Sequence, residues 1–190
     1  MKTLLLCGYR AGDNAENPIG VERDIDGQTV IDRRILQLRE LGHDIIAVLA
    51  GATADEQLRQ CRLIQTTELA FDISEPAGTL LSNTQAGALA TNGEGFYVLP
   101  AEIPVPSPAI WNFLLNEYGK LGFATNECLL QAVTPQGAPW QFGFPLLVTR
   151  NGNKLLRNTP ELKSLVDARL KSLQLEFKPH AELEPVSKPL

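Results

Sequence analysis

The chain has 190 residues, of which 44% are hydrophobic and 21% charged, and a formal net charge of -5. This length suits one ordinary domain and this hydrophobic content can fill a core, so the composition argues against two full catalytic domains and excludes general disorder. The apolar runs are far shorter than the roughly 20 residues of a membrane-spanning helix, and an acidic chain with few basic clusters suits neither duplex nucleic acid nor an anionic membrane, so we expect neither as a partner.

The N-terminal part of the chain predicts a strand, a helix and a second strand. Thr3–Cys7 is a short apolar run, and Gly8 then begins a long polar stretch without periodicity. A helical pattern begins at Thr29, which can cap it, and ends at Gly42. The nearly continuous apolar stretch from Asp44 to Gly51 is typical of a strand that is buried on both faces in a parallel sheet.

The rest of the chain continues this alternation. We expect a helix from Thr53 to about Leu63, a weaker strand near Glu68–Phe71 and a loop from Ser74 to Asn83. A short helix over Thr84–Ala90 and a strand over Phe96–Leu99, broken by Pro100, should follow. Ser107 and Pro108 open a further helix, strands are expected over Cys128–Val133 and Pro145–Thr149, and a last helix is expected from Thr159 to about Leu173. The alternation predicts a three-layer α/β domain with a mostly parallel sheet over residues 1–175, followed by an extended tail over residues 176–190.

In such a sheet the binding crevice lies beyond the carboxyl ends of the strands. The loops at Gly8–Gln28, Ser82–Gly87 and Pro100–Pro106 are the candidates. Gly8 would let backbone N–H groups approach a phosphate, although neither a dinucleotide-binding glycine motif nor a Walker loop is present. The first loop carries Arg10 and one other arginine against five acidic residues. A triphosphate would therefore need a divalent cation or an inward-facing Arg10, and a plain surface loop is the alternative interpretation.

Glu102 lies just past the fourth predicted strand, between Pro100 and Pro104. A carboxylate at such a stiff strand end is typical of magnesium sites that take their other ligands from phosphate and water. The alternative is an exposed glutamate in a turn.

The histidines and cysteines do not predict a nucleophilic site. His43 follows a helix end, where an imidazole can satisfy terminal carbonyls, and His180 lies in the tail. The three cysteines are widely spaced, which indicates a reducing compartment, and we expect a cytoplasmic protein. Cys7 is expected to be a small buried side chain at the end of the first strand.

The order of these segments resembles the nucleotidyltransferases of molybdenum cofactor biosynthesis, the molybdopterin cytidylyl- and guanylyltransferase group. Four places carry the resemblance. Leu4–Gly8 with Ile25–Ile31 is similar to the family's first strand, nucleotide loop and Gly-Lys-Pro segment, and Ser82–Leu89 is similar to its Ser-Ser-Leu-x-Ala-Gly-Leu turn. Phe96–Pro104 is similar to its strand that ends in Asp-x-Pro, and Phe142–Leu147 is similar to its Gly-His-Pro-Val-Leu segment. Together they span most of residues 3–150, in the family's order.

The resemblance implies a Rossmann-like nucleotidyltransferase fold and transfer of CMP or GMP from CTP or GTP to a phosphate-bearing acceptor such as molybdopterin. Pyrophosphate would leave as the acceptor phosphate attacks the α-phosphorus. It implies Arg10 and Glu102 as catalytic residues and Glu102 as the ligand of Mg²⁺. The nucleotide-binding positions that it implies are Cys7, Gly8, Arg10, Ser82, Asn83, Thr84 and Gly87.

Three departures bear on activity. No lysine occurs between Lys2 and Lys120, whereas the family's first loop carries one. Glu102 replaces the family's aspartate and extends the carboxylate by one methylene, about 1.5 Å. Phe144 replaces its histidine. A catalytically impaired, nucleotide-binding or regulatory relative is therefore the alternative, and a glycosyltransferase or sugar-nucleotide enzyme on the same architecture is a third hypothesis.

Overall fold

The computed structural model describes residues 1–7, 9–10, 27–50, 61–66, 70–71, 84, 87–122, 125–134, 136, 141, 144–158 and 170–174. Its strands form a seven-stranded sheet in the order β4-β3-β1-β6-β8-β7-β9 and a two-stranded sheet of β2 and β5. Their bounds are β1 Lys2–Cys7, β2 Tyr9–Arg10, β3 Asp44–Ala50, β4 Arg62–Thr66, β5 Ala70–Phe71, β6 Phe96–Pro100, β7 Leu129–Val133, β8 Leu146–Val148 and β9 Leu170–Gln174. Only β8 is antiparallel to its neighbours, β6 and β7, so the expected α/β class with a mostly parallel sheet is confirmed.

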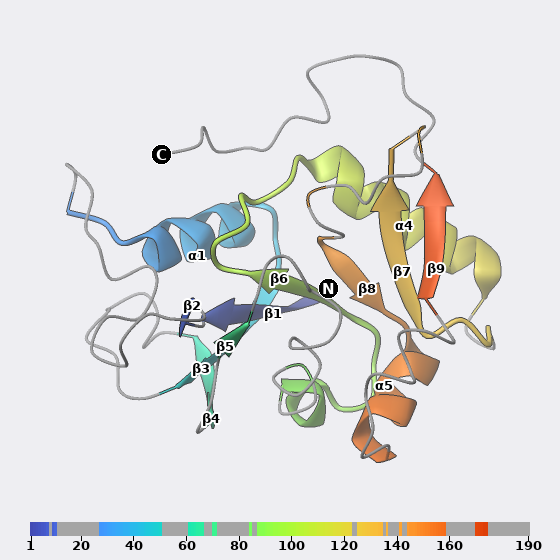
Figure 1. Ribbon diagram of the computed structural model, residues 1–190, viewed down its shortest axis with the longest axis horizontal. Coiled ribbons are helices and arrows are strands. Elements are labelled where there is room, and N and C mark those ends of the chain that lie inside the picture. The colour runs from blue at the N-terminus through green and yellow to red at the C-terminus, as the bar shows by residue number, and fades with distance from the viewer. Residues whose placement is uncertain are drawn as a thin grey trace.

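Helices cover both faces of the large sheet. Figure 1 shows α1 (Val30–Glu40) and α4 (Pro108–Leu121) on one side, and α5 (Arg150–Asn158) with the short helix that ends in η1 (Leu89–Thr91) on the other. Thr84, Gly87 and Ala88 are helical and precede η1. The described residues thus form the three layers expected from the alternating pattern. None of their helices is long and apolar enough to cross a membrane.

Helix α1 shows how its sequence sets its ends. The Thr29 hydroxyl accepts a hydrogen bond from the Asp32 N–H at 3.0 Å and so caps the first turn. After the helix, Gly42 has a φ of +76°, a left-handed conformation that glycine adopts without strain. Both boundaries were predicted from the sequence and are confirmed.

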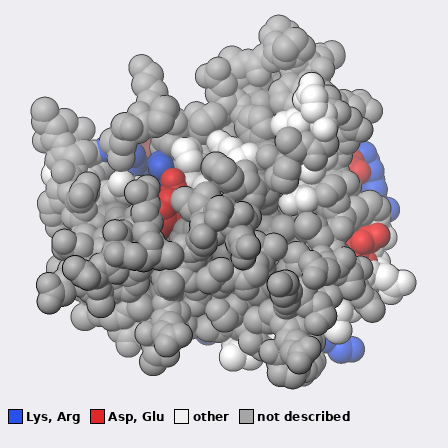
Figure 2. All heavy atoms as spheres, in the orientation of Figure 1, with Lys and Arg blue, Asp and Glu red and all other residues white. Residues whose placement is uncertain are grey.

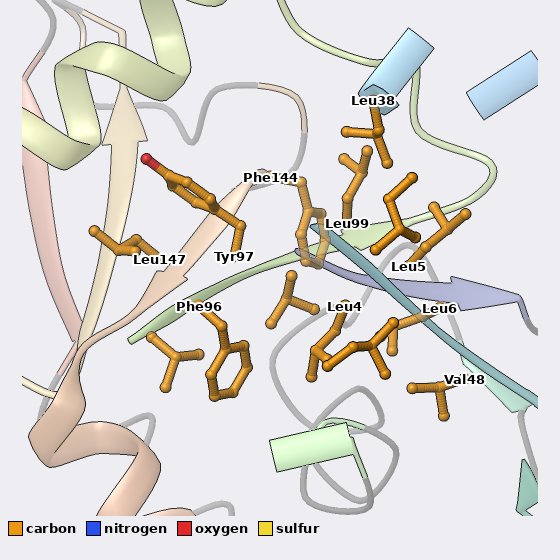
Figure 3. Close-up of a cluster of buried hydrophobic side chains, with 14 of the residues drawn as sticks. Leu4, Leu5, Leu6, Leu38, Val48, Phe96, Tyr97, Leu99, Phe144 and Leu147 are labelled. Atoms are coloured by element: carbon orange, nitrogen blue, oxygen red, sulfur yellow. The ribbon is translucent and has the colours of Figure 1, made fainter. Parts of the chain in front are cut away.

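The core lies around the three central strands β3, β1 and β6. Leu4 and Leu5 are fully buried, as are Phe96 and Leu99. Figure 3 shows these side chains extending from β1 and β6 together with Leu38 of α1, Val48 of β3 and the ring of Phe144. Burial on both faces explains why these strands read as continuous apolar runs in the sequence.

Two predictions about elements were wrong. The second helix was expected to reach Leu63, but Arg62–Thr66 forms β4, which pairs in parallel with β3. The last helix was expected to reach Leu173, but Leu170–Gln174 forms β9, which pairs with β7. Short apolar runs are ambiguous between helix and strand until a pairing partner is known. The strand expected over Phe96–Leu99 and broken by Pro100 is found as β6, which includes Pro100 as its last residue, paired with Leu6.

Helix α5 was not predicted. Its sequence contains a glycine and three asparagines, all poor helix formers. Several other predicted features lie outside the described residues: the beginnings of the helices at Thr53 and Thr159, the loop from Ser74 to Asn83, and the tail over residues 176–190.

Candidate functional site

The large sheet has its topological switch point between β1 and β6. From β1 the chain order proceeds outward through β3 and β4 on one side, whereas β6 lies on the other side. Ligands of open α/β sheets bind at such a point, outside the carboxyl ends of the strands. Leu6 pairs with Pro100 there, and the N–H of Ala101 donates to the Leu6 carbonyl at 2.9 Å. The end of the first strand and the segment that carries Glu102 are therefore held together by backbone hydrogen bonding.

The residues at the end of β1 are partly described. Cys7 is 5% exposed, and its thiol donates to the Leu5 carbonyl at 3.7 Å, so it has the expected role of a small core residue. Gly8 lies outside the described residues. Arg10 lies in β2, where its backbone pairs in parallel with Phe71. The direction of the Arg10 side chain is not part of the described structure, so its role stays a prediction.

Glu102 faces a cation from α1. Both of its carboxylate oxygens are buried. The neighbouring carbonyl, that of Ala101, accepts a hydrogen bond from Arg34 Nε at 3.2 Å, and Arg34 Nη1 donates to Gln37 Oε1 at 3.3 Å. Arg34 is only 6% exposed. Its burial and the nearby charge of Arg33 lower its pKa to about 10, while the negative charge of Glu102 acts in the opposite direction.

Sequence reasoning missed Arg34, although a signal was present. Arg34 lies three residues after Ile31 and next to Ile35, both of which are buried on the sheet side of α1. A charged residue in that stripe needs a polar partner, which the end of β6 provides. In Figure 2 acidic and basic side chains lie side by side in the region of α1 and the segment after β6.

The described residues fit a magnesium ion only if most of its ligands come from a bound substrate. Among them no three histidine, cysteine, aspartate or glutamate side chains come together. Glu102 offers two hard oxygen donors shielded from bulk water, and Mg²⁺ is commonly held by one or two carboxylates plus phosphates and water. The charge of Arg34 beside this carboxylate would oppose a metal that arrived without phosphate.

The short helix before η1 occupies the other face of the sheet. Thr84 is buried, and a Cβ on Gly87 would lie 2.6 Å from Leu4 Cδ1 and 3.1 Å from Val48 Cγ2. The absence of a Cβ at Gly87 thus lets this segment pack closely against β1 and β3. Thr91 reaches Lys2, since its carbonyl accepts from Lys2 Nζ at 3.5 Å. Ser82 and Asn83 lie outside the described residues.

This helix runs opposite to β1. Gly87 contacts Leu4 in the middle of the strand, and Thr91 contacts Lys2 at its amino end. The described helical residues therefore begin, at Thr84, toward the carboxyl ends of the strands. Thr84 and Glu102 thus lie toward the carboxyl ends of β1 and β6, and the meeting of the three loops stays a prediction.

Two further residues singled out in the sequence lie elsewhere. His43 is at the amino-end edge of the sheet, with Nδ1 2.6 Å from Thr3 Oγ1 and its ring against Trp111. The ring thus contacts side chains of β1 and α4, whereas the sequence suggested that it satisfies the terminal carbonyls of α1. Phe144 is 4% exposed in the core, so the position at which the resembled family has a histidine is here a packing residue.

No protein-family model matches the sequence, and no curated protein matches it significantly. Solved structures match its fold. Rv0371c from Mycobacterium tuberculosis H37Rv is 18% identical with a TM-score of 0.57 over 92% of this chain and 88% of that one. A cytidylyltransferase from Leptospira borgpetersenii is 10% identical with a TM-score of 0.55 over 92% and 76%. The 2-C-methyl-D-erythritol 4-phosphate cytidylyltransferase of Francisella tularensis is 9% identical with a TM-score of 0.52 over 98% and 94%. The chain therefore has the fold found in nucleotidyltransferases.

Proposed function

We propose that this protein binds a nucleoside triphosphate at the β1–β6 switch point and transfers its nucleotide to a phosphate-bearing acceptor. The observation that carries the proposal is the hydrogen bond from the Ala101 N–H to the Leu6 carbonyl, 2.9 Å long. It joins the end of β1 to the segment that carries Glu102, which supports a common site for the first loop and this carboxylate. The likeness to solved cytidylyltransferases supports the same class of reaction.

The reaction joins an acceptor phosphate oxygen to the α-phosphorus while the bond to the leaving pyrophosphate breaks. The transition state is then stabilised mainly by positive charge close to the phosphates. Glu102 would hold Mg²⁺, which when bound neutralises phosphate charge and orients the leaving group. Arg10 would add positive charge from the first loop. Gly8 and the turn of Ser82, Asn83, Thr84 and Gly87 would bind the nucleotide, with Cys7 supporting that loop from the core.

The finer assignment is transfer of CMP or GMP from CTP or GTP to molybdopterin. It rests on the four segments that resemble the molybdopterin nucleotidyltransferases, in their order along the chain. A cytoplasmic location, with its supply of these triphosphates, belongs to the same proposal.

A nucleotide-binding relative without transferase activity is the second candidate, and one observation favours it. The Glu102 oxygens are buried, and the positive charge of Arg34 is close enough to attract the carboxylate. A metal must compete with this internal cation. If the competition fails, the crevice would bind a nucleotide without catalysing its transfer.

The test combines binding and turnover on the full chain. Thermal shifts with CTP, GTP, ATP and UTP are measured with and without Mg²⁺, and pyrophosphate release is measured with molybdopterin. The transferase proposal predicts Mg²⁺-dependent release that falls on the order of 10²- to 10³-fold in Glu102→Gln. The matched control is Glu40→Gln, which makes the same change at an exposed glutamate, the last residue of α1, and should leave the rate within about twofold. Stabilisation without turnover would favour the second candidate, and no shift with any triphosphate would refute both.

A further inference from the structure

The arginine close to Glu102 lies on the side of α1 that is buried against the sheet. Arg34 is 6% exposed and is next to Ile35, which is fully buried. Taking a guanidinium out of water carries a large desolvation cost, which proteins offset with hydrogen bonds and opposite charges. A leucine at this position would pack against the sheet without that cost. Packing alone therefore does not explain the arginine.

The described contacts of Arg34 join α1 to the segment after β6. Nε donates to the Ala101 carbonyl at 3.2 Å, and Nη1 donates to Gln37 Oε1 at 3.3 Å. Both of these acceptors are neutral oxygens. Glu102 adds a negative charge, which raises the pKa of Arg34 and so counters part of the effect of burial. The guanidinium is thus tied by a hydrogen bond to the residue before Glu102 and by charge to Glu102 itself.

The charge of Arg34 acts in opposite directions on a metal ion and on a polyphosphate. A divalent cation at the Glu102 carboxylate is attracted by that group and repelled by the guanidinium. The phosphates of a nucleotide are attracted by the guanidinium, and they also supply oxygen ligands and negative charge to the metal. Because Arg34 is buried, solvent screens these interactions less than it would at the surface. The site therefore disfavours a bare metal ion and favours one that phosphate accompanies.

We propose that Arg34 is a positioning residue for Glu102 and makes the binding of a divalent cation at this carboxylate depend on phosphate; this inference rests on the proposed function. The hydrogen bond to Ala101 holds the segment that carries Glu102, and the charge keeps the affinity of the empty site for metal low. Removal of the charge should strengthen the binding of metal alone and weaken the binding of triphosphate alone. A site that is merely loosened would lose affinity for both.

The first measurement uses the metal alone, on the full chain without nucleotide. Binding of Mn²⁺ is followed by electron paramagnetic resonance. We expect Arg34→Gln and Arg34→Met to bind Mn²⁺ about tenfold more tightly than the wild type. Methionine also fills the space of the buried stem, so the result does not depend on one variant folding. Arg34→Lys keeps the charge and should bind Mn²⁺ as weakly as the wild type. The gain of Arg34→Gln should disappear when Glu102→Gln is added, because the carboxylate that receives the metal is then removed.

The second measurement uses the triphosphate without metal. Calorimetry with CTP and GTP in the presence of EDTA should show binding about tenfold weaker in Arg34→Gln than in the wild type. The matched control is Arg39→Gln, the same change on the same helix. Arg39 Nη2 contacts Cys61 Sγ at 3.7 Å, just before β4, and β4 lies on the opposite side of β1 from β6. Both affinities of this control should stay within about twofold of the wild type, and thermal unfolding checks that each variant is folded.

Four outcomes would overturn the inference. Equal Mn²⁺ affinities of the wild type and the two variants without the charge, with nucleotide binding intact, would refute the role of Arg34 alone. Loss of affinity for both Mn²⁺ and triphosphate would show a structural role only. A gain in Mn²⁺ affinity that persists without the Glu102 carboxylate would place the metal elsewhere. A wild-type chain that binds none of the triphosphates, with or without Mg²⁺, would refute the proposed function and the dependence on phosphate with it.

Discussion

The stability of this protein should fall on acidification because of one half-buried imidazole. His43 lies with Nδ1 2.6 Å from Thr3 Oγ1 and with its ring centroid 4.5 Å from that of Trp111. Burial, and to a smaller extent the positive charge of the N-terminus, lower its pKa from 6.5 to about 4. The folded protein thus keeps His43 neutral in a pH range where the unfolded chain protonates it.

The size of the effect follows from linkage. Between pH 6.5 and 4 the unfolded state binds one more proton, so the free energy of unfolding decreases as the pH falls through this window and levels off below it. A difference of about 2.5 units corresponds to roughly 3.4 kcal/mol if the ring is fully shielded. Since the ring is only half-buried and solvent screens it, we expect about half of this, ~1.5 kcal/mol.

Urea unfolding of the wild type and of His43→Gln at several pH values from 4 to 8 measures this contribution. Glutamine retains a hydrogen-bonding group toward Thr3 but does not titrate. The wild type should therefore lose ~1.5 kcal/mol more than the variant between pH 7 and 4. Parallel pH profiles of the two proteins would refute the reasoning, and so would a wild-type stability that increases toward pH 4.

Glycine substitutions test the packing that positions the crevice. Gly152→Ala should destabilise the fold by about 2 kcal/mol or more, because its Cβ would meet the backbone of Cys128 at 2.1 Å; the midpoint of thermal unfolding measures this loss. Gly87→Ala should cost about 1 kcal/mol, since the side chain of Leu4 can partly move away, and should also weaken nucleotide binding in the calorimetric assay. Gly119→Ala on α4, which has no neighbour within 4 Å, should be neutral or slightly stabilising; equal losses at all three positions would contradict the packing argument.

The parts of the fold that could be predicted have strong local signals. Thr29 and Gly42 mark the ends of α1 by cap chemistry, and the apolar runs of β1, β3 and β6 indicate burial on both faces. Helix α5 has no such signal, because it depends on contacts such as those of Asn153 and Arg157 with a segment 62 to 69 residues earlier in the chain. Local pattern cannot reveal contacts at that separation.

The candidate site was predictable to a similar extent. The place of Glu102 followed from the order of elements, since a residue after a strand must lie at its carboxyl end, whereas the position of β6 beside β1 is known only from the sheet order. The partnership of Glu102 with Arg34 could not be predicted, because it depends on which side of α1 packs toward β6. The position of Phe144 in the core likewise emerges only from the packed sheet.

The hydrogen bond between Ala101 and Leu6 extends the β1–β6 ladder beyond the last paired strand residue. The end of β1 and the segment that carries Glu102 are therefore joined through the backbone, independently of the side chains. Substitutions in these loops can abolish or restore chemistry while the frame that presents them persists. A lineage built on this frame could thus gain or lose catalytic turnover through a few surface changes, without first having to evolve a new fold.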